Sequence, residues 1–392
     1  MIAVAGLVVA MTAGPARAQS SSSFEAFIAS TAAAHATSGA DIDKQSYILD
    51  LYRGVKVDKT YVEDGNYFDC VRTETQPSLR GRAPATPPEA TTMGKGTDDV
   101  PAGVVGASQV VHCAAGTIPM QRVTLERMAK FATVKDYLAK KPGGAATQAA
   151  HRYAYGAQNV TNYGGNSWIN LWNPSGEFTL TQHWYTAYPT QGTQSVEGGW
   201  VHYPGKFGNN AVLFIFYTPD SYAHGCYNLE CSGFVQTNTN WSLGGAWSSY
   251  STYGGTQYGF QQQWKYYAGN WWLWLRGSGA NLEPVGYYPG TLYGAGTMSS
   301  NATWSKFGGE TCCASPWPQM GSGKLPSTGF GQAAYQNTIF YISSSASGGT
   351  GVWSSLTTSE THPACYKIAY TPASSGGSWG TYFYYGGPGG SC

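Results

Sequence analysis

Carboxylates are scarce in residues 151–392, and two of them lie in sequence contexts that suit acid–base chemistry. Glu197 precedes two glycines and a tryptophan in SVEGGWVHYP, and Glu310 follows two glycines in KFGGETCC. A carboxyl group among apolar and aromatic residues has a raised pKa, and a second carboxyl nearby raises one of the two further. Such a pair can share a proton, so that one carboxyl acts as base and the other as acid. The acidic residues of this region are Glu177, Glu197, Asp220, Glu230, Glu283, Glu310 and Glu360.

The same two contexts also allow a purely structural interpretation. Each glutamate could pair with an arginine or a lysine and contribute only to stability, since ion pairs also perturb acidic groups. The flanking glycines favour a functional role, because a residue without a side chain lets backbone and substrate approach closely. On the residues alone the two interpretations weigh about equally for Glu197 and for Glu310.

The composition of the chain changes sharply near residue 150, which indicates segments with different roles. All 14 tryptophans follow that point, and so do most of the 29 tyrosines. Charged residues make up 11% of the 392-residue chain and the formal net charge is +1, so no strong field points to nucleic acid or to an anionic membrane. We divide the chain into residues 1–18, 19–150 and 151–392, and expect a monomer.

The N-terminus predicts export, and residues 1–18 are expected to be a signal peptide. Residues 2–13 form a short apolar run, and Ala16-Arg17-Ala18 matches the small-residue pattern of a signal-peptidase site. The run is too short to span a bilayer, and no other stretch approaches 18 apolar residues. We therefore expect a secreted, extracellular protein that does not span a membrane.

The cysteines support the same compartment, because an even number in an exported chain favours disulfides. The sequence has 8 cysteines, with no C-x-x-C and no histidine at ligand spacing from a cysteine pair, so a zinc site is not expected. Adjacent cysteines rarely bridge each other, which leaves Cys312 and Cys313 without an obvious pairing. The expected bridges are Cys70–Cys113, Cys226–Cys231 and Cys365–Cys392.

The elements that must position the glutamates are predicted to be strands. After residue 150, short runs rich in β-branched and aromatic residues alternate with Gly, Asn, Ser and Pro turns, which is typical of an antiparallel sandwich or barrel. Residues 19–150 are expected to form a small α/β domain. Its expected elements are a helix over 22–35, a strand over 46–53, an exposed loop over 84–105 and a helix from Thr124 to Lys141.

Other catalytic signatures are absent or out of context. Gly376-Gly377-Ser378-Trp379-Gly380 matches G-x-S-x-G, but no histidine follows Ser378 and no strand–turn–helix context surrounds it. The chain has no H-E-x-x-H, no Walker loop and no Rossmann fingerprint after a plausible strand. We therefore expect neither a metal ion nor a cofactor.

The region from Glu197 to Asn238 resembles the core signature of the neprosin family of glutamic peptidases. Its recognisable parts are E-x-G-W-x-x-Y-P, LFIFYT and GCYNLxCxGFVQ. The motifs continue in family order through NWWLWL (270–275), VGYYP (285–289), FGGE (307–310) and QMGSG (319–323). Upstream, EDGNYFDCVRTETQPSLRG (63–81) resembles the family's activation segment, so the resemblance covers nearly all of the exported chain.

This resemblance implies a fold, an activity and two catalytic residues. The fold would be mainly β, an antiparallel β-sandwich over 151–392 preceded by an α/β pro-domain over 19–150 that inhibits the enzyme. The activity would be an acid endopeptidase that cleaves peptides on the carboxyl side of proline. The family's catalytic glutamates correspond to Glu197 and Glu310. The chain departs from the family pattern after FGGE, where Cys312 and Cys313 follow.

We expect a water molecule between the two carboxyls to attack the scissile carbonyl, with Glu310 as base and Glu197 as acid or oxyanion partner. Two alternatives from the residues alone remain open. A glycoside hydrolase also uses two carboxyls, and sugars stack on tryptophan. A non-catalytic, carbohydrate-binding sandwich would use the aromatic residues as a binding face.

Overall fold

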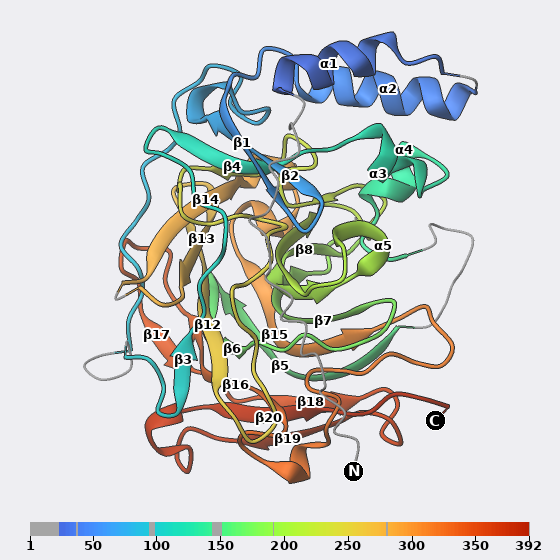
Figure 1. Ribbon diagram of the computed structural model, residues 1–392. Helices are drawn as coiled ribbons and strands as arrows, with labels where there is room; N and C mark the ends of the chain where they lie inside the picture. Colours follow the sequence, from blue (N-terminus) through green and yellow to red (C-terminus); the bar gives the residue numbers. More distant parts are fainter. Residues whose placement is uncertain are drawn as a thin grey trace, which may run out of the picture.

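The computed structural model describes residues 23–36, 38–93, 99–142, 151–190, 192–279 and 281–391. Two large sheets of mainly antiparallel strands lie against each other, with a small three-stranded sheet and short helices above them (Figure 1). The expected mainly-β sandwich is confirmed, and the sheets do not close into a barrel. The expected signal peptide lies outside the described residues.

The first sheet has 7 strands in the order β10-β9-β8-β7-β15-β5-β18. Its central strands β7 and β8 are buried at every position, because both faces of the sheet are covered. Burial on two sides explains why these strands show no alternation of apolar and polar residues. The strands are β5 (Arg152–Asn162), β7 (Thr179–Ala187), β8 (Gln194–His202), β9 (Val212–Thr218), β10 (Cys226–Tyr227), β15 (Ala302–Thr311) and β18 (Thr357–Glu360).

The second sheet has 10 strands, with β11-β14-β13-β12-β6-β16-β20-β19 as its main path. Strand β17 pairs with β16, and β3 pairs with β12. The strands are β3 (Val104–Gly106), β6 (Gly164–Asn170), β11 (Val235–Gln236), β12 (Gln257–Tyr267), β13 (Asn270–Arg276), β14 (Glu283–Pro289), β16 (Ala334–Ile342), β17 (Gly351–Trp353), β19 (Lys367–Thr371) and β20 (Tyr382–Gly386).

Most of the tryptophans belong to the core of the sandwich. Ten of the 14 are buried, and Trp200, Trp264 and Trp271 are among the largest side chains that are fully enclosed. Aromatic side chains supply large apolar area, so a charge-poor chain can build a stable core from them. Buried rings cannot stack on a sugar, which removes most of the support that tryptophan gave to a carbohydrate-binding face.

Residues 23–142, here called the N-terminal segment, combine helices with a small antiparallel sheet in the order β1-β2-β4. The expected bridge between Cys70 and Cys113 is present. The elements are α1 (Phe24–Ala33), α2 (Gly39–Leu51), β1 (Val57–Glu63), β2 (Asn66–Arg72), β4 (Thr117–Gln121), α3 (Leu125–Ala129) and α4 (Val134–Leu138).

Two of the expected elements in this segment were wrong in type or extent. Residues 46–51 form the end of helix α2 and residues 52–53 a turn, rather than a strand, with Ile48 and Leu51 buried on one helical face. A short apolar run fits the period of a helix as well as that of a strand. The hydroxyl of Ser38 caps the helix by accepting a hydrogen bond from the Asp41 backbone N–H, which favours the helix. The helix expected from Thr124 to Lys141 is divided into α3 and α4, because Thr133 starts a new helix with a capping box.

The N-terminal segment does not stand apart from the sandwich. Most of residues 84–105 form the expected loop, but the loop ends in β3, which pairs in parallel with Gln257–Gly259 of β12. Thr91 also exchanges two main-chain hydrogen bonds with the amide of Gln263. Figure 1 shows the result, since β3 lies beside strands of the C-terminal half, far from β1, β2 and β4.

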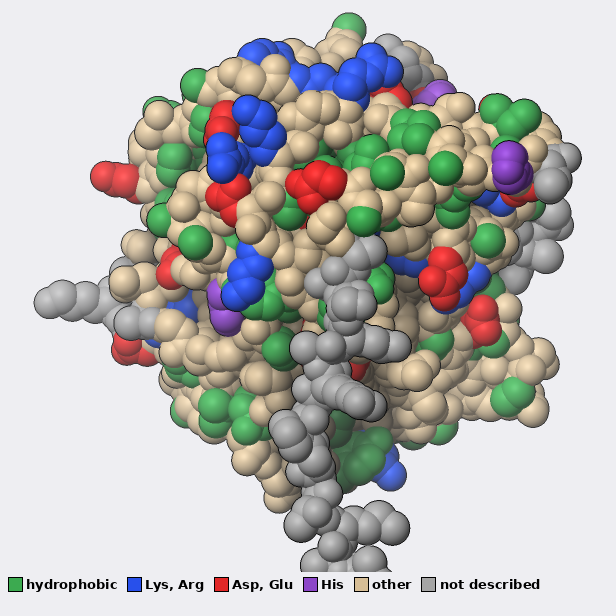
Figure 2. All heavy atoms as spheres, turned by 45° about the horizontal axis from the view of Figure 1, so that its top comes forward, with side chains coloured by type: hydrophobic (Ala, Val, Ile, Leu, Met, Phe, Trp, Pro, Cys, Tyr) green, Lys and Arg blue, Asp and Glu red, His purple; other side chains and the backbone are tan. Residues whose placement is uncertain are grey.

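The surface agrees with the low content of charge. Figure 2 shows charged side chains of both signs standing singly or in small groups among uncharged atoms. Within the described part of the chain, no helix is long and apolar enough to cross a membrane.

Candidate active site

Glu197 and Glu310 lie on the same face of the first sheet. Strand β7 separates their strands, and Glu197 pairs with Trp184 while Glu310 pairs with Leu180. Directly opposed residues of an antiparallel ladder share a face, and so do alternate residues of one strand. Gln182 therefore lies on that face between the two glutamates. The sheet brings together the two carboxylates that the sequence singled out.

Both carboxylates are buried and share one cation. Glu197 is 0% exposed and Glu310 is 1% exposed. The ammonium of Lys140 lies 2.5 Å from Glu197 Oε2 and 3.1 Å from Glu310 Oε2. Lys140 belongs to the N-terminal segment and is itself buried. The lysine follows helix α4, where Ala139 turns the chain into an extended conformation that reaches the sheet.

Each glutamate has its own set of further donors. The Ser195 hydroxyl donates to Glu197 Oε1 at 2.6 Å, and the Tyr222 hydroxyl donates to the same oxygen at 2.9 Å. Glu310 Oε1 pairs with His151 Nδ1, and the Gln182 amide donates to Glu310 Oε2 at 3.3 Å. These contacts fix both carboxyl groups in orientation.

The charges around Glu310 keep it ionised. Burial by itself would raise the pKa of this carboxyl, but Lys140 and His151 outweigh burial and lower it to about 2. Lys140 shows the complementary effect, since burial opposes its charge while the two glutamates raise its pKa above the ordinary lysine value. The cluster in this form is thus a closed ion-pair network.

A cavity of about 490 Å³ opens beside this network. Residues from both parts of the chain line it, including Lys140 and Lys141 on one side and Tyr153, Trp184 and Tyr222 on the other. The sandwich contributes these three aromatic side chains to the lining, together with Glu310. The cavity is the space that remains after residues of the N-terminal segment have entered the site.

The glycines beside the glutamates serve the packing of the two sheets as well as the site. A Cβ atom at Gly309 would lie 2.7 Å from both Met320 Cγ and Tyr385 Cε2, and one at Gly198 would lie 2.9 Å from Gln262 Nε2. These neighbours belong to the opposite side of the strand from Glu197 and Glu310. The close approach that glycine permits here is therefore between the sheets.

Replacing Gly309 by alanine should lower the free energy of unfolding by about 1–3 kcal/mol, because overpacking forces Met320 or Tyr385 out of place. Gly39 offers a matched control, since a Cβ atom there meets nothing within 4 Å. Gly39→Ala should leave stability unchanged or slightly higher. Urea unfolding monitored by tryptophan fluorescence measures both, and equal midpoints for the two variants would contradict the tight packing at Gly309.

The disulfides near the site partly match the expectation. Cys226 and Cys231 are bridged as expected. Cys312 and Cys313, whose pairing the sequence left open, are bridged to each other, and Cys313 has a φ of 77°. The proposed partner of Cys365 lies outside the described residues.

Three residues that could bind a metal ion lie close together: the donor atoms of His151, Cys312 and Cys313 are all within 4.8 Å of one another. Both sulfurs are in a disulfide, so neither is a thiolate ligand. His151 Nδ1 is already paired with Glu310. The donor set therefore does not fit a metal ion in this form of the protein.

Sequence reasoning missed the partners of the two glutamates. Lys140 lies more than fifty residues from Glu197 along the chain and in a segment with ordinary charge, so nothing local marks it. Gln182, Tyr222 and His151 carry no motif either. The pairing of strands is the only signal that could have found Gln182, because it requires the order of β8, β7 and β15.

The fold and the site can be compared with known proteins. A model of the Neprosin family matches residues 175–388, which is more than half of the 392-residue chain and includes Glu197 and Glu310. Crystal structures of scytalido-glutamic peptidase with a transition state analog inhibitor and with a peptide based transition state analog are each 11% identical to this chain. They cover 61% of it and 98% of their own chains, with TM-scores of 0.32 and 0.33, which is too distant to place site residues. On the family match, the chain belongs to the neprosin family of glutamic peptidases.

Proposed function

We propose that this glutamic peptidase is an acid-active endopeptidase whose catalytic residues are Glu197 and Glu310. The observation that carries the proposal is that two fully buried carboxylates converge on one sheet face, on either side of Gln182. An apolar core gains little from two enclosed charges, since apolar residues of similar volume are often as stabilising. Buried carboxylates next to a cavity, one of them with a shifted pKa, are typical of catalytic sites.

Once Lys140 has left, the different surroundings of Glu310 and Glu197 decide which of the two acts as base and which as acid. His151 still lies beside Glu310 and lowers the pKa of that carboxyl against the effect of burial, which favours the ionised form of Glu310 and makes it the base. Glu310 takes a proton from water as the water oxygen bonds to the scissile carbonyl carbon. Glu197 in its protonated form donates to the carbonyl oxygen or to the leaving nitrogen, and the carbon–nitrogen bond then breaks.

We further propose that the chain is a zymogen, with the segment from Gln19 to about residue 150 as its inhibitory pro-domain. Lys140 supports this, because its ammonium occupies the space between the two carboxyls that a catalytic water needs. The ammonium also pairs with Oε2 of each carboxyl, so neither oxygen is available to a water molecule or to a substrate carbonyl. Latency thus has a chemical as well as a steric basis.

Substrate preference and location complete the proposal. The family resemblance implies cleavage on the carboxyl side of proline, and the aromatic wall formed by Tyr153, Trp184 and Tyr222 suits that rigid apolar ring. Secretion is supported by two disulfides in different parts of the chain, Cys70–Cys113 and Cys226–Cys231, because disulfides form in oxidising compartments. We propose a secreted monomer that acts on proline-containing peptides and proteins.

The experiment that tests the activity is digestion of a proline-containing peptide and of a polysaccharide by the acid-treated protein, with products identified by mass across pH 2–7. We expect cleavage after proline in acid and no release of sugar. Sugar release without peptide cleavage would favour the glycoside hydrolase alternative. The absence of both cleaved peptide and released sugar would favour a non-catalytic binding protein.

Acid should release the N-terminal segment. The pKa of Glu310 lies below its ordinary value of 4.5, so its contribution to docking is fully present above that pH and is lost as pH falls toward about 2. Incubation at about pH 4, near the reference carboxyl pKa, should therefore start processing that does not occur at pH 7. N-terminal sequencing should place the new terminus between Gly143 and His151, with the bond after Pro142 as one candidate. A chain that stays full length and is nevertheless fully active would sink the zymogen proposal.

A further inference from the structure

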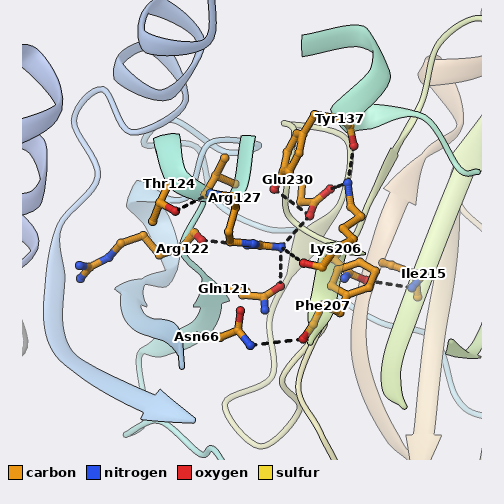
Figure 3. A network of polar contacts seen from close by, with 12 residues as sticks. Asn66, Gln121, Arg122, Thr124, Arg127, Tyr137, Lys206, Phe207, Ile215 and Glu230 are labelled. Carbon is orange, nitrogen blue, oxygen red and sulfur yellow. Dashed lines mark hydrogen bonds and ion pairs between the residues drawn. The ribbon is translucent and has the colours of Figure 1, made fainter. Parts of the chain in front are cut away.

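A second pair of buried charges lies apart from the two glutamates and takes no part in the chemistry above. Lys206 and Glu230, both from the C-terminal half, are 3% and 2% exposed, and their side chains lie 2.8 Å apart (Figure 3). Removing two ions from water costs several kcal/mol each, and apolar side chains would serve the core as well. The pair therefore calls for a role other than stability.

The N-terminal segment fills the space around this pair with Tyr137. The Tyr137 hydroxyl donates to Glu230 Oε1 at 2.9 Å, and the ammonium of Lys206 donates to the main-chain carbonyl of Tyr137. The same ammonium lies 3.8 Å from the centre of the Tyr137 ring. Figure 3 shows Tyr137 entering from the N-terminal segment, with Lys206 and Glu230 facing it. Lys206 and Glu230 together thus contact the ring, the hydroxyl and the main-chain carbonyl of Tyr137.

The contact continues directly to the candidate active site. Lys140 follows Tyr137 by three residues, and its main-chain carbonyl accepts a hydrogen bond from the Tyr227 hydroxyl at 2.6 Å. The side chain of Lys140 then lies between Glu197 and Glu310. Residues 137–140 therefore follow one path from the buried pair to the two carboxyls.

Two features of this path are independent of the pro-domain sequence. Lys206 and Tyr227 bind carbonyl oxygens of the main chain, which every peptide possesses. Tyr227 is itself held in place by the rings of Phe207 and Phe216, at centroid distances of 5.3 and 5.1 Å. All of these residues belong to the C-terminal half and remain after the N-terminal segment has been removed. The path is thus a peptide-binding surface that the pro-domain occupies.

We propose that Lys206, Tyr227 and Glu230 form a substrate-binding subsite that accepts a tyrosine side chain of a peptide substrate. The inference rests on the proposed release of the N-terminal segment and adds a specificity determinant away from the proline. Lys206 and Tyr227 hold the peptide backbone, and Glu230 selects tyrosine over phenylalanine by accepting the phenol hydrogen bond. Hydrogen bonds to charged groups are among the stronger ones, so the preference should be roughly ten- to hundredfold.

The charge of Lys206 is retained under the conditions of the reaction. Burial lowers its pKa to about 8 while Glu230 opposes the shift. The group is consequently protonated throughout the acid range in which the peptidase is proposed to work. The cation that binds the peptide carbonyl is therefore present when a substrate arrives.

The test uses a synthetic peptide of residues 133–141, which contains Tyr137 and Lys140 and ends before Pro142. We expect it to inhibit the acid-processed chain competitively and to bind it in isothermal titration calorimetry. The peptide with Tyr137→Phe should bind roughly ten- to hundredfold more weakly, because only the hydroxyl contact is removed. A Lys140→Met peptide controls for the separate contact at the two carboxyls.

A variant of the enzyme closes the thermodynamic cycle. In Glu230→Ala the tyrosine and phenylalanine peptides should bind equally, whereas Glu177→Ala, which removes an exposed glutamate, should leave the difference intact. Glu230 also pairs with Arg127 of the N-terminal segment at 3.2 Å. If Glu230→Ala fails to fold because Lys206 and Arg127 lose this partner, the comparison of the two peptides on the unmodified chain decides.

The outcomes separate this inference from the proposed function. Equal affinity of the tyrosine and phenylalanine peptides, or no binding of either, would overturn the subsite even if the chain cleaves peptides. A chain that prefers the tyrosine peptide yet cleaves no substrate would support the subsite and count against the peptidase mechanism.

Discussion

Glu197→Gln and Glu310→Gln should each reduce peptidase activity by about 10² or more while leaving the fold intact. Each substitution is nearly isosteric, so the loss would fall on proton transfer rather than on packing. Both side chains are buried and converge on Lys140, which makes an indirect effect through solvent exposure implausible. The activity of the acid-treated variants on a proline-containing peptide measures the effect.

Structure and function must be separated in this experiment. Circular dichroism and the urea midpoint should show that both variants fold, although the loss of one buried charge leaves Lys140 with a single partner in the full-length chain. Glu283→Gln is a control, because Glu283 lies on β14 of the other sheet and is only partly buried. Near-full activity in either site variant would remove that glutamate from the mechanism.

Lys140→Met should convert the full-length chain from a latent into an active form. The substitution leaves two buried carboxyls without their shared cation, and an unpaired buried charge costs about 3–5 kcal/mol, which corresponds to more than a hundredfold weaker docking of the segment. The expected result is peptidase activity, or rapid loss of the N-terminal segment, at a pH where the unmodified chain is silent. A fluorogenic proline-containing peptide and gel electrophoresis at about pH 5, just above the ordinary carboxyl pKa, measure both.

The adjacent residue provides a matched control. Lys141 carries the same charge, lines the same cavity, and forms no ion pair with a carboxylate among the described residues. Lys141→Met should therefore remain latent. If the Lys140→Met chain is as inactive and as intact as the unmodified protein, the lysine does not maintain latency.

The sequence brought Glu197 and Glu310 into one candidate site, but it did not predict which residues surround them. Glu197 and Glu310 were selected because a charge-poor region makes each carboxyl conspicuous, and the sheet brings both to one face. The competing interpretation, that each glutamate pairs with a basic residue, also describes this form of the protein, since Lys140 pairs with both. A residue that reaches the site from another segment leaves no local pattern in the sequence.

The fold shows the same division between local and long-range information. The apolar and aromatic runs at 177–187, 195–203, 211–218 and 270–276 predict strands, and β7, β8, β9 and β13 lie close to those bounds, because such runs between turn residues are a local signal. Residues 46–53 were assigned to a strand because a short apolar run does not distinguish the two periods. The pairing of β3 with β12 joins residues about 150 positions apart, and only the tertiary structure reveals it.

The most direct test of the central claim is the dependence of kcat/KM on pH for the acid-processed chain with a proline-containing peptide. If one carboxyl must be ionised and the other protonated, the profile is bell-shaped with its maximum in acid, and its two apparent pKa values belong to the Glu197–Glu310 pair. The account predicts this shape and activity close to zero at neutral pH. A plateau that extends through pH 8 would contradict a mechanism in which these two glutamates share one proton.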